Sequence, residues 1–201
     1  MKATHYGHCQ ICGSRQLLPS NVLAKHGYTT RWGFFSGVCP GSGFKPFEQA
    51  TNLIEDSIAR AQREAFNLRA SAITLRGTST GSTTWVTVYD SATWKDRSSR
   101  TRWVEVELTE TVREITGWQG EAATVSTFSY TVEARQMDGS MKAKAQRLDT
   151  YGAVKTLADA VAYGNGKRAD YLDGQAAQYD TYATWQRERI AHWAPVALTA
   201  R

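Results

Sequence analysis

The chain has 201 residues, a formal net charge of +5 at neutral pH and 41% hydrophobic residues, a length that fits one large domain or a small module joined to a larger one. This apolar content excludes a generally disordered chain. No apolar run approaches the roughly 18 residues of a membrane span, and the first residues lack the apolar stretch of a signal peptide, so we expect a cytoplasmic protein without a membrane partner.

The positive charge is concentrated at the N-terminal end. The first acidic residue is Glu48. Five basic residues precede it: Lys2, Arg15, Lys25, Arg31 and Lys45. The rest of the chain is therefore close to neutral. This segment is suited to contact with phosphate or with an acidic protein face, although a basic surface also serves solubility alone.

The cysteines of the chain all lie in this basic segment. Cys9 and Cys12 form a C-x-x-C-G sequence, in which a tight turn lets two thiolates converge on one ion and Gly13 leaves room for backbone amides to face the sulfurs. Cys39 is the only other thiol. Three free thiols, or a redox pair outside the usual βαβ setting, are the alternatives to a metal site.

A tetrahedral zinc site needs a fourth ligand, and histidine is the residue type to look for. His26 lies between Cys12 and Cys39 and is the best candidate. His5 and His8 compete, although a ligand next to Cys9 would strain the turn, and His192 is too distant to assign. Four protein ligands would close the coordination shell. We therefore expect one structural Zn²⁺ per chain, on which folding of this segment depends.

The same segment resembles a known kind of module. The stretches CQICG, KHGY, RWGFFSGVCPGS and KPFE are similar to a recurrent N-terminal module of uncharacterised phage and prophage proteins, over about residues 5–60. The resemblance implies the metal set Cys9, Cys12, His26 and Cys39. It also implies a mobile-element setting, in the cytoplasm of a host cell, and brings no known activity. Relatives often carry a further Cys in the helix that follows, and its absence here argues against a second metal.

Two stretches have the apolar spacing of long amphipathic helices. Over residues 46–73, apolar side chains recur at spacings of three and four, and Pro46 suits the first helical turn. Residues 167–193 repeat in the same way, after a shorter predicted helix at 153–163 that would end at Gly164. The Ala-rich seams predict an antiparallel, coiled-coil-like pair, and they would also allow pairing between chains in a homo-oligomer or a phage structural component.

Between these helices the period changes to two. Four segments alternate apolar and polar side chains and predict three or four antiparallel strands: 83–89, 101–108, 111–118 and 123–132. On the first, Val86 and Val88 make the better core face. The predicted fold class is α+β, with a Cys₃His zinc module (1–45), a long helix (46–73), an antiparallel β-insert (74–150) and a helical C-terminal region (151–201) that pairs with the first helix.

The sequence carries no recognisable catalytic motif. It has no P-loop, no G-x-G-x-x-G, no H-E-x-x-H and no G-x-S-x-G. Glu105 and Glu107 lie at strand spacing near several arginines, which is typical of a solvated, cross-strand-paired surface. An enzyme is therefore the least favoured class.

A cluster of basic and aromatic residues predicts a binding surface instead. Such residues suit phosphate contact with base stacking, and equally a protein interface, or they keep a hairpin tip soluble. The candidates are Arg31, Trp32, Trp94, Lys95, Arg97, Arg100, Arg102 and Trp103. The leading hypothesis is a zinc-stabilised phage or prophage protein that binds a host protein, most plausibly a component of an antiviral defence system. The main alternative is a nucleic-acid-binding regulator.

Overall fold

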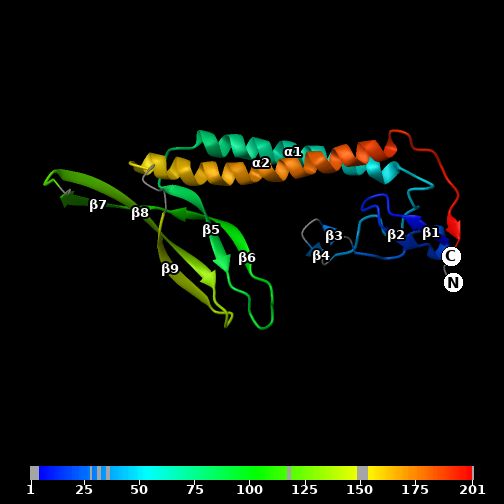
Figure 1. Ribbon diagram of the computed structural model, residues 1–201, viewed down its shortest axis with the longest axis horizontal. Helices are drawn as coiled ribbons and strands as arrows, with labels where there is room; N and C mark the ends of the chain where they lie inside the picture. Colours follow the sequence, from blue (N-terminus) through cyan, green and yellow to red (C-terminus); the bar gives the residue numbers. More distant parts are fainter. Residues whose placement is uncertain are drawn as a thin grey trace. The chain divides into compact units, whose positions relative to one another are not determined.

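The computed structural model describes six stretches of the chain: residues 5–27, 29–30, 33–34, 37–116, 119–148 and 154–200. It confirms the α+β class, with helices α1 (Asn52–Gly77) and α2 (Leu157–Ile190) and antiparallel strands (Figure 1). The chain divides into two compact units. The N-terminal unit comprises Met1–Phe66 and Ala176–Arg201, and the central unit comprises Asn67–Gln175. Each unit therefore contains one part of α1 and one part of α2.

Short strands frame the N-terminal unit. The strands are β1 (His5–His8), β2 (Arg15–Leu17), β3 (Thr29–Thr30), β4 (Gly33–Phe34) and β10 (Thr199–Ala200), with a 3₁₀ turn at Pro19–Asn21. The first sheet has the order β10-β1-β2, so the C-terminal end of the described chain pairs with its N-terminal end. None of these strands was expected from the sequence, because each is too short to show a period of two.

Helix α1 begins later than the sequence predicts. Residues from Pro46 onward form turns, and regular helix starts only at Asn52, where Gln10 Oε1 accepts a hydrogen bond from the Leu53 N–H. The prediction that Pro46 lies in the first helical turn was wrong. Phe47 instead has its carbonyl bonded by Trp193 Nε1 at 2.7 Å, and the Glu48 carboxylate accepts the His8 N–H.

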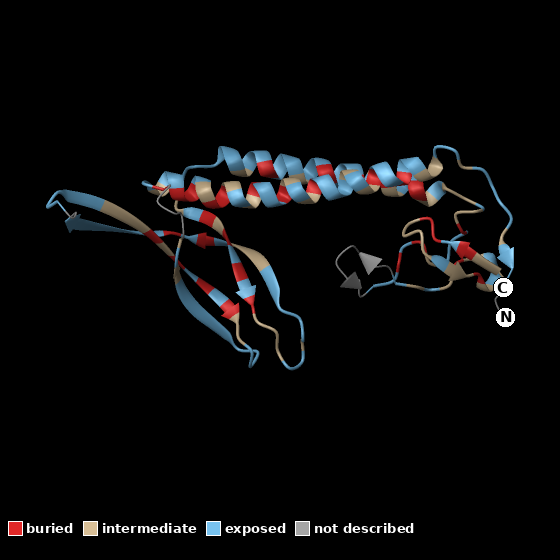
Figure 2. Ribbon diagram, viewed as in Figure 1, coloured by how far each residue is buried: buried red, intermediate tan, exposed pale blue. Residues whose placement is uncertain are grey.

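The helices pack through thin seams of small side chains in each unit. In the N-terminal unit Ile54, Ile58 and Ala61 cluster with Ala183. In the central unit the buried cluster is Ala72, Ala169 and Leu172, and Arg76 pairs with Asp170 and Asp173. Figure 2 shows buried positions recurring along both helices between exposed ones. Antiparallel packing through Ala-rich seams is as the sequence predicts.

Helix α2 is continuous where the sequence predicts a break. It begins after a reciprocal cap, in which Thr156 Oγ1 accepts the Asp159 N–H and Asp159 Oδ2 accepts the Thr156 N–H. It then runs through Gly164 to Ile190, so the predicted helix end at Gly164 was wrong. A Cβ on Gly164 would overlap Thr84 Oγ1. Strand β5 therefore passes so close to the helix at this position that only glycine fits without a clash.

Two sheets make up the β-part of the central unit. The five strands are β5 (Thr83–Asp90), β6 (Arg100–Glu107), β7 (Thr109–Thr116), β8 (Ala122–Arg135) and β9 (Met141–Arg147). Strands β5 and β6 form a hairpin, and β7 and β9 pair with the two halves of β8. Val86 and Val88 face the core, as predicted. Strand β9, with its lysines and exposed surface, was not predicted, and Trp118 lies outside the described residues.

Candidate metal centre

A tight turn presents the first two cysteines. The Gly13 N–H donates to the Cys9 carbonyl at 2.9 Å, and the Cys9 N–H donates to the Ser14 carbonyl at 2.9 Å. Gly13 has a φ of 72°, in the left-handed region that glycine adopts without strain. A second glycine, Gly41, passes so close that a Cβ there would overlap Cys9 Sγ. The backbone is therefore shaped around these two sulfur atoms.

The four predicted ligands lie together. The ligand atoms of Cys9, Cys12, His26 and Cys39 all lie within 4.8 Å of one another. Cys9 Sγ is 3.7 Å from Cys39 Sγ, and Cys12 Sγ is 3.6 Å from His26 Nε2. Cys9 and Cys39 are buried, whereas Cys12 and His26 are half-buried. A group of this composition and spacing can hold a metal ion.

Hydrogen bonds fix the tautomer of His26. Its Nδ1 is 2.8 Å from the carbonyl oxygen of Ala24. Because a carbonyl oxygen only accepts, Nδ1 carries the proton, and the lone pair of Nε2 faces the sulfurs. Ser42 supports the same residue, since its Oγ accepts the backbone His26 N–H at 3.2 Å and lies 3.1 Å from Nδ1. An outer partner that orients the ring is the usual arrangement for a metal-binding histidine.

The other histidines of the chain lie elsewhere. His8 Nδ1 is 2.5 Å from Glu48 Oε1, so this side chain is held by a carboxylate. His5 belongs to strand β1, opposite Ala200. His192 is exposed in the turn after α2. Of the candidates that the sequence left open, only His26 joins the cysteines in the part of the chain that the structure describes.

Contacts among the three cysteines and their burial shift the pKa values of the thiols. A hydrogen bond from Cys9 is the main reason that the pKa of Cys12 falls to about 4, while the same bond raises the pKa of Cys9. Burial raises the pKa of Cys39. Without a cation the cluster therefore favours one thiolate and two thiols. Three thiolates at this spacing would repel one another strongly unless a cation lies among them.

Side chains that the sequence analysis missed join the turn to both helices. Gln10 is fully buried and bonds the start of α1 as well as the Lys45 carbonyl. From α2, Gln186 Nε2 donates to the Ile11 carbonyl at 3.0 Å, and Arg189 Nη1 donates to the Gln10 carbonyl at 2.7 Å. The only sequence signal was Gln186, a polar residue in an otherwise apolar helix seam.

The predicted binding residues that the structure describes lie on different faces of the β5–β6 hairpin and in its loop. Arg31 and Trp32 lie outside the described residues. Trp94, Lys95 and Arg97 lie in the loop between β5 and β6, and Trp94 is 93% exposed. We call these three residues the hairpin loop cluster. It is the part of the prediction that presents free basic and aromatic groups to solvent.

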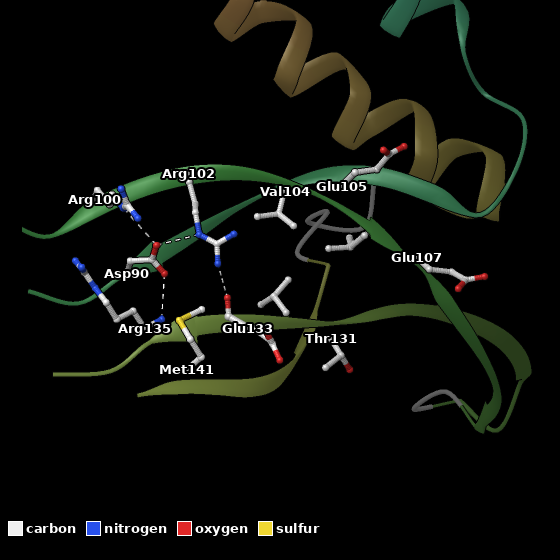
Figure 3. A pocket seen from close by; sticks show the side chains of 12 residues that line it. Asp90, Arg100, Arg102, Val104, Glu105, Glu107, Thr131, Glu133, Arg135 and Met141 are labelled. Atoms are coloured by element: carbon white, nitrogen blue, oxygen red, sulfur yellow. Dashed lines mark hydrogen bonds and ion pairs between the residues drawn. The ribbon is translucent and has the colours of Figure 1, made fainter. Parts of the chain in front are cut away.

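Two other predicted residues form ion pairs with a carboxylate of the same unit. Figure 3 shows Arg100 and Arg102 directed toward the buried Asp90, at 3.6 and 2.9 Å, beside a groove of about 660 Å³. The Arg135 N–H also donates to Asp90, and this bond is the main reason that the pKa of the carboxyl is lowered. Arg102 and Asp90 therefore bind the β5–β6 hairpin to β8, where Arg102 also bonds the Glu133 carbonyl.

Trp103, the last predicted residue, faces the opposite side of the hairpin. Side chains alternate along β6, so Trp103 points away from Arg102 and Val104. It lies against Tyr171 of α2, with ring centroids 5.7 Å apart, and the Arg168 guanidinium lies 5.3 Å from its ring. This aromatic and arginine contact was not visible in the sequence because its members lie more than 60 positions apart.

Comparison of the chain with protein-family models, with curated proteins and with solved structures gave no match. In the described part of the chain, no helix is both long and apolar enough to cross a membrane.

Proposed function

We propose that the cluster of Cys9, Cys12, His26 and Cys39 holds one structural zinc ion. Zinc bonds of about 2.3 Å to sulfur and about 2.0–2.1 Å to nitrogen give tetrahedral edges of about 3.8 Å between sulfurs and about 3.6 Å from sulfur to nitrogen. Two of the six separations between ligand atoms match these edges, at 3.7 Å from Cys9 Sγ to Cys39 Sγ and 3.6 Å from Cys12 Sγ to His26 Nε2, and all six are within 4.8 Å. This agreement is the observation that carries the proposal.

A zinc ion with four protein ligands has a structural role. Catalytic zinc usually keeps one position for water or substrate, whereas this donor set fills the tetrahedron. The zinc would neutralise most of the thiolate charge and fix the turn that contacts the start of α1 and the end of α2. We therefore infer a zinc-stabilised binding protein and not an enzyme.

Metal content and ligand variants test the zinc site. Purified protein should contain about one zinc per chain, and Cys39→Ala and His26→Ala should each lose or weaken it. His8→Ala is the matched control, because His8 is also a histidine beside the turn but bonds Glu48. Zinc content that falls equally in His8→Ala, or protein without metal after preparation in zinc-supplemented medium, would contradict the proposed ligand set.

We further propose that the protein binds a host protein through the hairpin loop cluster. Tryptophan and arginine are the residue types most enriched at binding hot spots, and Trp94 is almost fully exposed. Resemblance to phage and prophage modules makes a host protein, such as a defence component, the expected target. A nucleic-acid target is less favoured, since Arg102 forms an ion pair with the buried Asp90 and is therefore less available to phosphate.

Affinity purification from host extract tests the partner class. The zinc-loaded protein should retain one host protein in stoichiometric amount, and Trp94→Ala with Arg97→Gln should release it. Lys142→Gln, an exposed basic residue of β9, is the control and should retain it. Failure to recover a protein, beside tight nucleic-acid binding that weakens steeply between about 50 and 200 mM salt, would support the regulator instead.

A further inference from the structure

One face of the β5–β6 hairpin carries aromatic side chains that the core does not use. Cross-strand partners share a face, and the register pairs Trp85 with Glu105, Thr87 with Trp103 and Tyr89 with Thr101. Tyr89 is 61% exposed on this face. Trp85 and Trp103 are half-buried, because Arg168 of α2 lies over them.

Among the described residues, the contacts of the Arg168 guanidinium are with aromatic rings. Its guanidinium carbon lies 5.1 Å from the ring centroid of Trp85, 5.3 Å from that of Trp103 and 5.2 Å from that of Tyr171. We call Arg168 and these three aromatic residues the Arg168 platform. Rings on several sides orient the planar guanidinium and shield it from part of the solvent, and this burial lowers its pKa.

The N–H groups of Arg168 have no protein partner among the described residues, and no described carboxylate lies within ion-pair distance of it. Other arginines of the chain are used differently. Arg76 pairs with two carboxylates, Arg135 with Asp96, and Arg189, which also lies over two rings, donates to backbone carbonyls. Arg168 thus presents an oriented and unpaired fork of donors.

We propose that the Arg168 platform binds a carboxylate side chain of a protein partner, with neighbouring apolar side chains of that partner packing on Trp103 and Tyr89. A carboxylate matches the guanidinium fork through two parallel hydrogen bonds, and the aromatic surround strengthens such a pair by excluding water. This inference rests on the proposed protein-binding function and names a surface and a partner chemistry for it.

A nucleic acid fits this face less well. Glu105 and Glu107 lie on the same face of the hairpin, where they would repel a continuous phosphate backbone but tolerate a single acidic side chain. The guanidinium also covers the ring faces on which bases would stack. One positive group among acidic neighbours selects an isolated carboxylate.

Direct binding to a defined probe tests the platform without the natural partner. The probe is a short fluorescent peptide with one Glu among Tyr and Leu residues and no other charged side chain, and its binding to full-length zinc-loaded protein is measured by anisotropy in about 50 mM salt. Arg168→Gln should weaken binding about tenfold, and Arg168→Lys should weaken it by an intermediate factor because it keeps the charge and loses the fork. Arg113→Gln, an exposed residue of β7, is the matched control and should change binding less than about twofold.

Three outcomes would overturn the inference. These are unchanged binding in Arg168→Gln, an equal loss in Arg113→Gln, and tighter Arg168-dependent binding of an oligothymidylate of about 20 nucleotides than of the peptide. Thermal unfolding of each variant checks that the fold is intact, and Arg168→Lys remains informative if Arg168→Gln unfolds. Capture of a host protein that persists in Arg168→Gln and is lost with the hairpin loop cluster would overturn the platform while leaving the proposed function intact.

Discussion

Arg189 brings a positive charge to the metal cluster from outside its ligand set. Its guanidinium donates to the carbonyls of Cys9 and Gln10 and lies over the rings of Phe47 and Trp185. A zinc ion with three thiolates and one imidazole has a net charge of about −1. With the proposed zinc bound, Arg189 would supply the compensating charge from the last turn of α2.

Replacement of Arg189 should weaken both folding and metal binding. In Arg189→Met, the buried carbonyls of Cys9 and Gln10 lose charged donors, and we expect the free energy of unfolding to fall by about 2 kcal/mol. The zinc affinity should fall with it, as measured by competition with a chromogenic chelator. Arg187→Met, an exposed neighbour in the same helical turn, is the control. Equal effects of the two substitutions would show that Arg189 has no specific role.

Asp90 should make the stability of the central unit depend on pH. Its pKa is lowered, chiefly by the Arg135 N–H and then by Arg102, so its folded pKa lies below the unfolded value of about 3.9. The stabilisation is therefore complete above about pH 4 and is lost as the pH falls through the folded pKa. Asp90→Asn should cost about 1–2 kcal/mol at pH 7, since the buried side chain loses its charge while Arg102, about a third of whose side chain is exposed, keeps part of its hydration.

Denaturant unfolding of wild type and Asp90→Asn between pH 2 and 7 checks this expectation. The difference in unfolding free energy should shrink toward zero at the acid end. Glu110→Gln, an exposed carboxylate of β7, controls for general charge effects and should show a small difference throughout. A difference for Asp90→Asn that stays constant with pH would rule out the carboxylate charge as the cause.

At the scale of elements, sequence patterns predicted what is local. The C-x-x-C-G spacing predicted a turn, and the repeated small residues predicted which face of each helix is buried. Both patterns are formed by residues that lie close together in the sequence. The sequence favoured His26 over His8 but left His8 open, and the structure decides between them because His8 contacts Glu48, 40 residues away in the chain. The same holds for Gln186 and Arg189, whose partners lie more than 170 positions away.

Gly164 shows why a local signal can mislead. Glycine often ends a helix, and the sequence predicts an end here, but the residue is needed for close packing of helix on strand. A helix interior tolerates a glycine when neighbouring turns and packing hold the backbone, at a cost of about 1 kcal/mol relative to alanine. Thr84 Oγ1, which donates to the Val161 carbonyl at 2.9 Å, provides that packing.

Two glycine substitutions in α2 separate the effect of helix propensity from the effect of packing against β5. Gly164→Ala should destabilise the protein by about 1–3 kcal/mol, because the added methyl group would overlap Thr84 and lie 2.7 Å from the Trp85 carbonyl oxygen. Gly166→Ala, two positions along, meets open space and should stabilise the protein by up to about 1 kcal/mol. Thermal unfolding measures both. Stabilisation by both substitutions would mean that β5 does not approach the helix as described.

At the scale of the whole molecule, the two units depend on different sources of stability. The central unit has the largest apolar cluster, in which Val86, Val132 and Val161 join aromatic side chains of β8. In the N-terminal unit, the part outside the helices has a small cluster of Leu18 and Leu23 around Cys9 and Cys39. Without metal, that cluster is centred on thiols that compete for protons. A unit of this kind normally needs its ion to fold.

Removal of zinc should therefore affect the units unequally. After chelation, we expect amide hydrogen exchange to rise by orders of magnitude in β1, β2 and the segment from Cys39 to Ala50, and to stay slow in β5, β6 and β8. The distal turns of α2 near Gln186 and Arg189 should lose protection together with β1, because their side chains bond the metal-binding turn. Exchange in the part of α2 near Val161 should not change.

Re-addition of zinc should restore protection only where the ligands are intact. Cys39→Ala should behave as the chelated protein at all zinc concentrations, and His8→Ala should recover as wild type does. Uniform loss of protection across both units would mean that they fold as one cooperative body, and unchanged protection everywhere would mean that the thiol cluster folds without its ion. The unequal response follows from one physical difference, because a large apolar core needs no ligand whereas three facing thiolates need a cation.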